Sequence, residues 1–228
     1  MVGACLDNCR HTIAMADKVT FSNEKVRDSV YALIENFRPV KTLGAIRPID
    51  PNDIPAPFSS LLVHHSHMTV AMESFHGHSV SLEIVNETPD LMNGRTSYTR
   101  EILLKSPVFN DKAFGVALRH DENQKSNKNR VVQYGVVRIN LDHLPPDVVA
   151  HIQNGSTPLG RILIEADLHR EVRCVGVFEV LPGPDFGKLC LDPKKQSLLP
   201  RTYGRFATIS VFEQPVIELF EVVVPSVK

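Results

Sequence analysis

The strongest constraint on the fold is a series of strand-like segments joined by short hairpin connections. In the first of them, Val80, Leu82 and Ile84 alternate with polar residues, which is typical of a half-buried strand. Hairpin connections make neighbouring strands antiparallel, and helices inserted between them indicate the α+β class. We therefore expect an antiparallel sheet with strands at residues 80–84, 99–104, 114–118, 131–139, 171–181, 203–212 and 216–224.

The N-terminal part has a different pattern. Apolar residues recur at helical spacing from Val26 to Phe37, after Ser22 as a candidate N-cap, which predicts one amphipathic helix. Residues 47–57 then contain four prolines, which favour an extended connector. We therefore expect an N-terminal extension over residues 1–50 and a main domain over residues 51–228.

Composition excludes several classes of function. The chain has 228 residues, 43% of them hydrophobic, enough for one domain with a sizeable core. Its 25 basic and 26 acidic residues give a formal net charge of −1, which offers no electrostatic basis for binding nucleic acid or a membrane. No apolar run is long enough to span a bilayer, and residues 1–16 lack the core of a secretory signal. We expect a cytoplasmic protein whose four cysteines are reduced.

One segment, STPLGRIL at residues 156–163, has the chemistry of a helix start. A serine or threonine before Pro158 can act as the N-cap, and proline suits the first helical position because its missing N–H is not needed there. The free amides of Leu159 and Gly160 would then point toward any anion at the helix N-terminus. Most such caps bind nothing, so this segment gains weight only together with others.

Three further segments complete a family pattern. They are SHMT at residues 66–69, YTREILL at residues 98–104 and QPVIELFEVVVP at residues 214–225. In this order, and with STPLGRIL, they resemble chorismate lyase over about residues 58–225. The motifs are short and their spacings differ from those of the family, so the resemblance is to a distant member.

The resemblance implies a fold, an activity and a kind of partner. The fold would be an antiparallel sheet with helices packed on one face and a closed ligand pocket covered by flaps. The activity would be elimination of pyruvate from chorismate to give 4-hydroxybenzoate, a reaction that serves ubiquinone or related aromatic metabolism. The partner would be the small-molecule substrate alone, because this lyase chemistry requires no cofactor and no metal.

The family motifs indicate how the carboxylate of the substrate would be bound. Arg100 begins the REILL motif, and an arginine can form a bidentate pair with a carboxylate. The alternative is a surface arginine paired with Glu83 or Glu101. By resemblance, the amides of Leu159 and Gly160 would hold the same carboxylate.

The opposite end of the pocket is assigned to the last strand. Glu221 is followed by three apolar residues and Pro225, as in the family, and an apolar pocket would let it donate a proton to the departing ether oxygen. Glu218 is the rival, and strand alternation allows only one of the two to enter the pocket. Met68 resembles a flap methionine that covers the ligand, although an ordinary core methionine is the alternative.

Two features of the sequence differ from the chorismate lyase pattern. The family often has Gly-Arg on the strand after the first hairpin. Here two valines separate Gly135 from Arg138, so Arg138, Arg119 or flap histidines would have to replace that arginine. Histidines are crowded around the expected flap, but they form no zinc motif, and we expect no metal. They are His64, His65, His67, His76 and His78.

A binding module is the alternative to an enzyme. The same fold resembles effector-binding domains of some transcription regulators, which hold small ligands without converting them. Such domains normally follow a winged DNA-binding domain, and residues 1–50 are too short and too weakly basic for one. A lyase-like enzyme for another enolpyruvyl acid is a further alternative.

Overall fold

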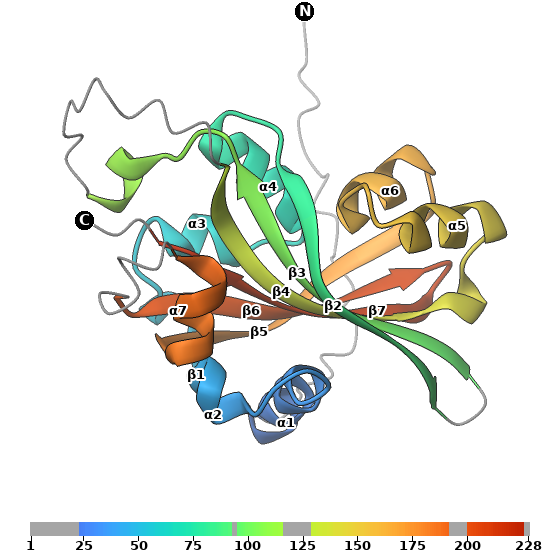
Figure 1. The fold of residues 1–228 in the computed structure, drawn as a ribbon, viewed down its shortest axis with the longest axis horizontal. Helices are drawn as coiled ribbons and strands as arrows, with labels where there is room; N and C mark the ends of the chain where they lie inside the picture. Colours follow the sequence, from blue (N-terminus) through green and yellow to red (C-terminus); the bar gives the residue numbers. More distant parts are fainter. Residues whose placement is uncertain (1–22, 93–94, 116–128, 192–199, 226–228) are drawn as a thin grey trace, which may run out of the picture.

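The computed structural model describes residues 23–92, 95–115, 129–191 and 200–225. In this part of the chain seven strands form one antiparallel sheet with the order β1-β5-β6-β7-β4-β3-β2 (Figure 1). The expected α+β class with an antiparallel sheet is therefore confirmed. The strands are β1 (Gly44–Ile49), β2 (Ser81–Met92), β3 (Arg95–Ser106), β4 (Arg130–Asn140), β5 (Arg170–Pro182), β6 (Thr202–Val211) and β7 (Gln214–Val223).

Helices cover both faces of this sheet (Figure 1). Strand alternation separates the two cores: Val136 of β4 packs on the side of α1, and its neighbour Val137 packs on the opposite side. The expected helices on one face of the sheet are α3 (Phe58–Leu62), α4 (Met68–His76), α5 (Pro146–Asn154) and α6 (Leu159–Glu165). The expectation needs extending, because α1 (Asn23–Ile34), α2 (Val40–Leu43) and α7 (Pro184–Cys190) lie on the other face.

The N-terminal helix and the first strand are built into the same core as the rest of the sheet. The helix α1 was expected from its apolar spacing, and it buries Val26, Val30 and Leu33 against the sheet. Strand β1 pairs with β5, with Ile46 opposite Val180. A boundary at residue 50 would cut between β1 and the rest of its sheet, so residues 23–50 form one structural unit with the domain.

Some elements differ from the sequence expectations. The strand expected at residues 114–118 is described only at Phe114, which ends a short 3-10 helix (Asp111–Phe114), and at the turn residue Gly115. Its remainder, like Arg119, Cys5 and Cys9, lies outside the described residues. Strand β1 and helix α7 were not expected, since β1 contains Pro48 and α7 begins at the second proline of a Pro-Gly-Pro sequence. Two further 3-10 turns lie at Pro51–Asp53 and Leu141–His143.

A buried carboxylate on β3 binds the segment that follows α1 to the sheet. Glu101 of β3 is fully buried and accepts hydrogen bonds from Arg38 Nε at 2.6 Å and Nη2 at 2.5 Å. Its oxygens also accept from Tyr134 Oη at 2.7 Å and Asn86 Nδ2 at 2.6 Å. Burial and the nearby Glu101 charge raise the pKa of Tyr134 well above its usual value, which keeps its hydroxyl a donor.

Candidate functional site

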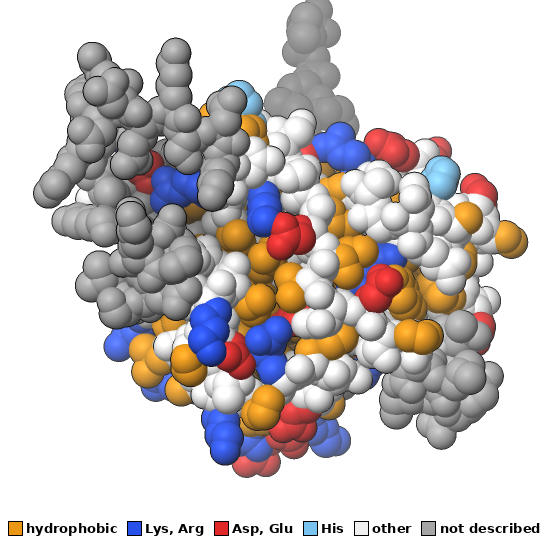
Figure 2. Space-filling model, in the orientation of Figure 1, with side chains coloured by type: hydrophobic (Ala, Val, Ile, Leu, Met, Phe, Trp, Pro, Cys, Tyr) orange, Lys and Arg blue, Asp and Glu red, His pale blue; other side chains and the backbone are white. Residues whose placement is uncertain are grey.

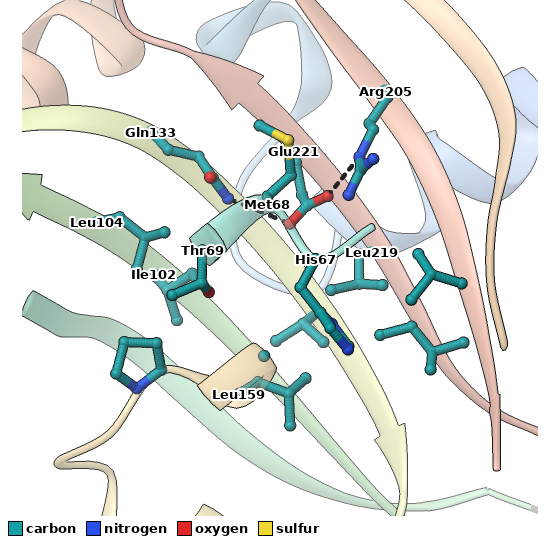
Figure 3. Close-up of a pocket in the computed structure, with 15 residues that line it drawn as sticks. His67, Met68, Thr69, Ile102, Leu104, Gln133, Leu159, Arg205, Leu219 and Glu221 are labelled. Atoms are coloured by element: carbon teal, nitrogen blue, oxygen red, sulfur yellow. Dashed lines mark hydrogen bonds and ion pairs between the residues drawn. The ribbon is translucent and has the colours of Figure 1, made fainter. Parts of the chain in front are cut away.

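A narrow cavity lies between the sheet and the helices α4 and α6 (Figure 3). Its volume is about 40 Å³, room for a few water molecules, so a larger ligand requires the covering helices to move. Most of its surface is apolar, with a small group of polar side chains. The strands contribute Ile102, Leu104, Gln133, Val137, Val172, Arg205, Ile209, Leu219 and Glu221, and the covering segments contribute His67, Met68, Thr69, Pro158, Leu159 and Gly160.

The polar group is centred on a buried ion pair. Arg205 of β6 and Glu221 of β7 face each other across the last hairpin, and Arg205 Nε donates to Glu221 Oε2 at 2.8 Å. Their exposed fractions are only 1% and 6%. Gln133 of β4 donates from Nε2 to the other carboxylate oxygen at 3.3 Å (Figure 3). Glu221 thus accepts hydrogen bonds from both neighbours.

One buried acceptor in this group has no partner. The amide oxygen Oε1 of Gln133 makes no hydrogen bond to any described residue, although Gln133 is only 2% exposed. Buried polar atoms are almost always paired, so an unpaired one at a cavity wall indicates a missing donor. A ligand hydroxyl or N–H beside Glu221 would supply it.

Arg205 also holds the segment that leads into α4. Its Nη1 donates to the backbone oxygen of His64 at 3.1 Å and lies 3.1 Å from His64 Nδ1, and its Nη2 donates to the backbone oxygen of Ser66 at 3.0 Å. The covering segment is therefore tied to the floor of the cavity through the same guanidinium that pairs with Glu221.

Three of the five predicted site residues, Met68, Leu159 and Gly160, belong to the segments that cover the cavity. Met68 begins α4 and is 2% exposed, and Leu159 lies on the opposite side of the cavity from Glu221 (Figure 3). The N–H groups of Leu159 and Gly160 have no hydrogen-bond partner among the described residues. A Cβ at Gly160 would come within 3.0 Å of His67 Cβ and Thr69 Oγ1, so glycine lets α6 approach the start of α4.

Glu221 is placed as strand alternation requires. It faces the cavity, whereas Glu218 lies on the opposite face of β7, where Arg138 Nη1 donates to it at 3.1 Å. Arg138 therefore points away from the cavity and does not replace the arginine of the family pattern.

Arg100 is not among the residues that line the cavity. It shares the cavity-facing side of β3 with Ile102, but its guanidinium stacks on the ring of Tyr98 at 4.4 Å and donates to the backbone oxygen of Ile152 at the end of α5. Its Nε makes no hydrogen bond within the described residues and lies 3.9 Å from Glu87 Oε2, so the carboxylate paired with Arg100 is that of Glu87 and not of Glu83 or Glu101. Contacts with α5, which the sequence motif does not include, decide this orientation.

The histidine at the cavity wall is neutral. Burial, together with the positive charges of Arg170 and Arg205, lowers the pKa of His67 to about 4. Its Nε2 then accepts a hydrogen bond from Arg170 Nε at 3.0 Å. Within the described ranges, no three histidine, cysteine or acidic side chains form a group that could hold a metal ion.

Two of the polar cavity residues were missed from the sequence. Gln133 and Arg205 both lie in expected strands but belong to none of the family segments. Counting outward from the last hairpin turn would place Arg205 opposite Phe220, and only a β-bulge between Ile209 and Ser210 brings it opposite Glu221. For Gln133 no sequence signal was present.

Surface properties add two observations. On the face shown in Figure 2, acidic and basic side chains are interspersed among apolar ones, and the described residues form no extended patch of one sign there. None of the helices in the described ranges has the length and apolar character that a bilayer crossing requires.

Comparisons with known proteins assign no family. No protein-family model matches the chain, and no curated protein does. Among solved structures, the gene product SA0254 from Staphylococcus aureus is similar with 9% sequence identity and a TM-score of 0.38, over 63% of this chain and 82% of that one. The C-terminal domain of the histidine utilization repressor from Pseudomonas syringae is similar with 14% identity and a TM-score of 0.38, over 65% and 96% of the two chains. Similarity this low assigns neither a ligand nor an activity to the present chain.

Proposed function

We propose that this chain binds a small aromatic acid carrying a hydroxyl group in the cavity between the sheet and the helices α4 and α6. Small-molecule sites are mostly apolar, with a few polar groups that fix the orientation of the ligand. The cavity has this composition, with an apolar middle formed by Ile102, Leu104 and Leu219.

The observation that carries the proposal is the unpaired oxygen of Gln133 beside Glu221. Both groups accept hydrogen bonds, so this end of the cavity favours a ligand that donates one, such as a phenol. The other end offers the free N–H groups of Leu159 and Gly160, which suit the carboxylate of the same ligand. A ring substituted at opposite positions would span the two ends.

The ligand hydroxyl provides the first test. Wild-type protein is expected to bind 4-hydroxybenzoate about tenfold more tightly than 4-methoxybenzoate, because only the hydroxyl can donate to Gln133 and Glu221. Replacing Gln133 with leucine should remove most of this preference. Isothermal titration calorimetry would measure the four affinities, and thermal-shift titrations would report ligand-dependent stabilisation.

Gln153→Leu is the matched control, since this glutamine is exposed on α5 and outside the cavity. It should leave the preference unchanged. Binding of neither acid at millimolar concentration, or equal preference in wild type and Gln133→Leu, would refute the proposal.

Pyruvate elimination from chorismate is the second candidate function. It is favoured by one observation, that Glu221 reaches the cavity from the last strand as the lyase pattern requires. In this arrangement Glu221 accepts hydrogen bonds from Arg205 and Gln133, so its part would be to orient the ring and its substituent by accepting a hydrogen bond. Enclosure would exclude water while the C–O bond breaks and the ring becomes aromatic.

A turnover assay separates the two candidates. Purified protein is mixed with chorismate, and pyruvate and 4-hydroxybenzoate are measured together. If the chain is a lyase, both products form in equal amounts, and Glu221→Gln slows their formation about a hundredfold while Glu218→Gln does not. Product formation at the uncatalysed rate would exclude the lyase and leave binding as the function.

A further inference from the structure

A second hollow lies on the outer side of the cavity wall. It is a surface groove of about 590 Å³ between α4, α6 and the start of β5, the neighbouring elements seen at the top of Figure 1. His67 and Val172 line both the groove and the inner cavity. The groove and the cavity are therefore separated by a wall one side chain thick.

The groove contains an arginine without a carboxylate partner. Arg170 makes no ion pair with the acidic residues of the described ranges, although most arginines there do. Its Nε donates to His67 Nε2 and its Nη1 donates to the backbone oxygen of Leu168 at 2.9 Å. A guanidinium has five N–H bonds, so three remain for an anion.

The rest of the groove fits the apolar part of such an anion. Val70 of α4 and Ile164 of α6 are 44% and 39% exposed there, so they give the groove an apolar surface. Leu168 and Val172 add to this apolar surface, and the other lining residues are polar. Asp167 is the one acidic residue in the lining. The combination of an unpaired cation and an exposed aliphatic surface favours a carboxylate with an apolar body over inorganic anions.

We propose that this groove is a second binding site, in which Arg170 binds the carboxylate of a small apolar acid and Val70 and Ile164 contact its apolar body. A bound carboxylate accepts hydrogen bonds from the three N–H groups of Arg170 that remain free, and the hydrogen bond from Arg170 Nε to His67 stays in place. A further step, in which the same acid enters the inner cavity, rests on the proposed function.

Methyl NMR of the full chain resolves the two sites in one titration. With valine, leucine and isoleucine methyl groups labelled, benzoate is expected to shift Val70 and Ile164 in wild type. Arg170→Gln should weaken this response about tenfold or more, since a charge-assisted contact is lost. Arg170→Lys, which keeps the charge, should retain most of it. Arg173→Gln is the matched control, because Arg173 is exposed and paired with Glu171 on the other face of β5.

The outcomes distinguish this inference from the proposed function. Shifts at Val70 and Ile164 without shifts at the cavity methyls of Leu159 and Leu219 would support the groove site and refute the cavity proposal. Shifts confined to the cavity methyls would refute the groove site alone. Groove shifts of equal size in wild type and Arg170→Gln would also overturn the inference, since binding would then not depend on the guanidinium.

Discussion

Replacing Arg205 with leucine is expected to lower the free energy of unfolding by about 3–5 kcal/mol, the range for removing one partner of a buried ion pair. The variant would leave the carboxylate of Glu221 buried with only Gln133 as a donor. It would also remove the donors to the backbone oxygens of His64 and Ser66. Urea unfolding at fixed protein concentration measures the loss as a lower midpoint.

The companion variants identify the cause of this loss. Arg205→Leu combined with Glu221→Leu should be more stable than Arg205→Leu alone, because no unpaired charge is then buried. Arg27→Met removes an arginine from an exposed pair with Asp28 and should leave the urea midpoint close to that of wild type. An Arg205→Leu protein with the wild-type midpoint would show that the pair is not buried as described.

Arg38→Met is expected to cost about 3 kcal/mol for a related reason, the isolation of a fully buried carboxylate. Glu101 would keep the hydroxyl of Tyr134 and the amide of Asn86 as donors but lose its cation. Because Arg38 follows α1 in the chain, we also expect α1 to loosen. Amide hydrogen exchange in residues 26–34 should therefore become faster, and urea unfolding should give the global loss.

Arg47→Met is the control for this variant. Arg47 also pairs with a buried carboxylate, that of Glu179, but Glu179 keeps Arg201 as a second partner at 2.8 Å. The urea midpoint of Arg47→Met is therefore expected to stay close to that of wild type. Equal losses for Arg38→Met and Arg47→Met would contradict the assignment of Glu101 as the carboxylate that depends on a single cation.

The two buried carboxylates have different consequences for function. Glu101 lies on the face of α1, away from the cavity, so its variants should change stability with little effect on ligand preference. Glu221 lies in the cavity and is linked through Arg205 to the segment that covers it. A ligand that contacts Glu221 therefore contacts the partner of Arg205, the residue that holds the cover in place.

Local patterns in the sequence were sufficient for those features that a short stretch of chain encodes. The apolar spacing of Val26 to Leu33 identifies α1 and its buried face, and alternation along the last strand separates Glu221 from Glu218. Pro158 and Gly160 mark the start of α6, although proline is the N-cap itself and not the first helical residue. Each of these features is encoded by the residues of a single element, whatever that element packs against.

The tertiary structure alone decided which side chains meet. Arg205 and Gln133 become neighbours of Glu221 only when β6, β7 and β4 pair in register, and Arg100 turns to α5 because that helix ends beside it. Strand β1 escaped detection since its six residues pair with β5 more than a hundred residues later. Periodicity reports which face of an element is buried. The partner on that face depends on contacts between distant segments, and these determined the cavity and its polar group.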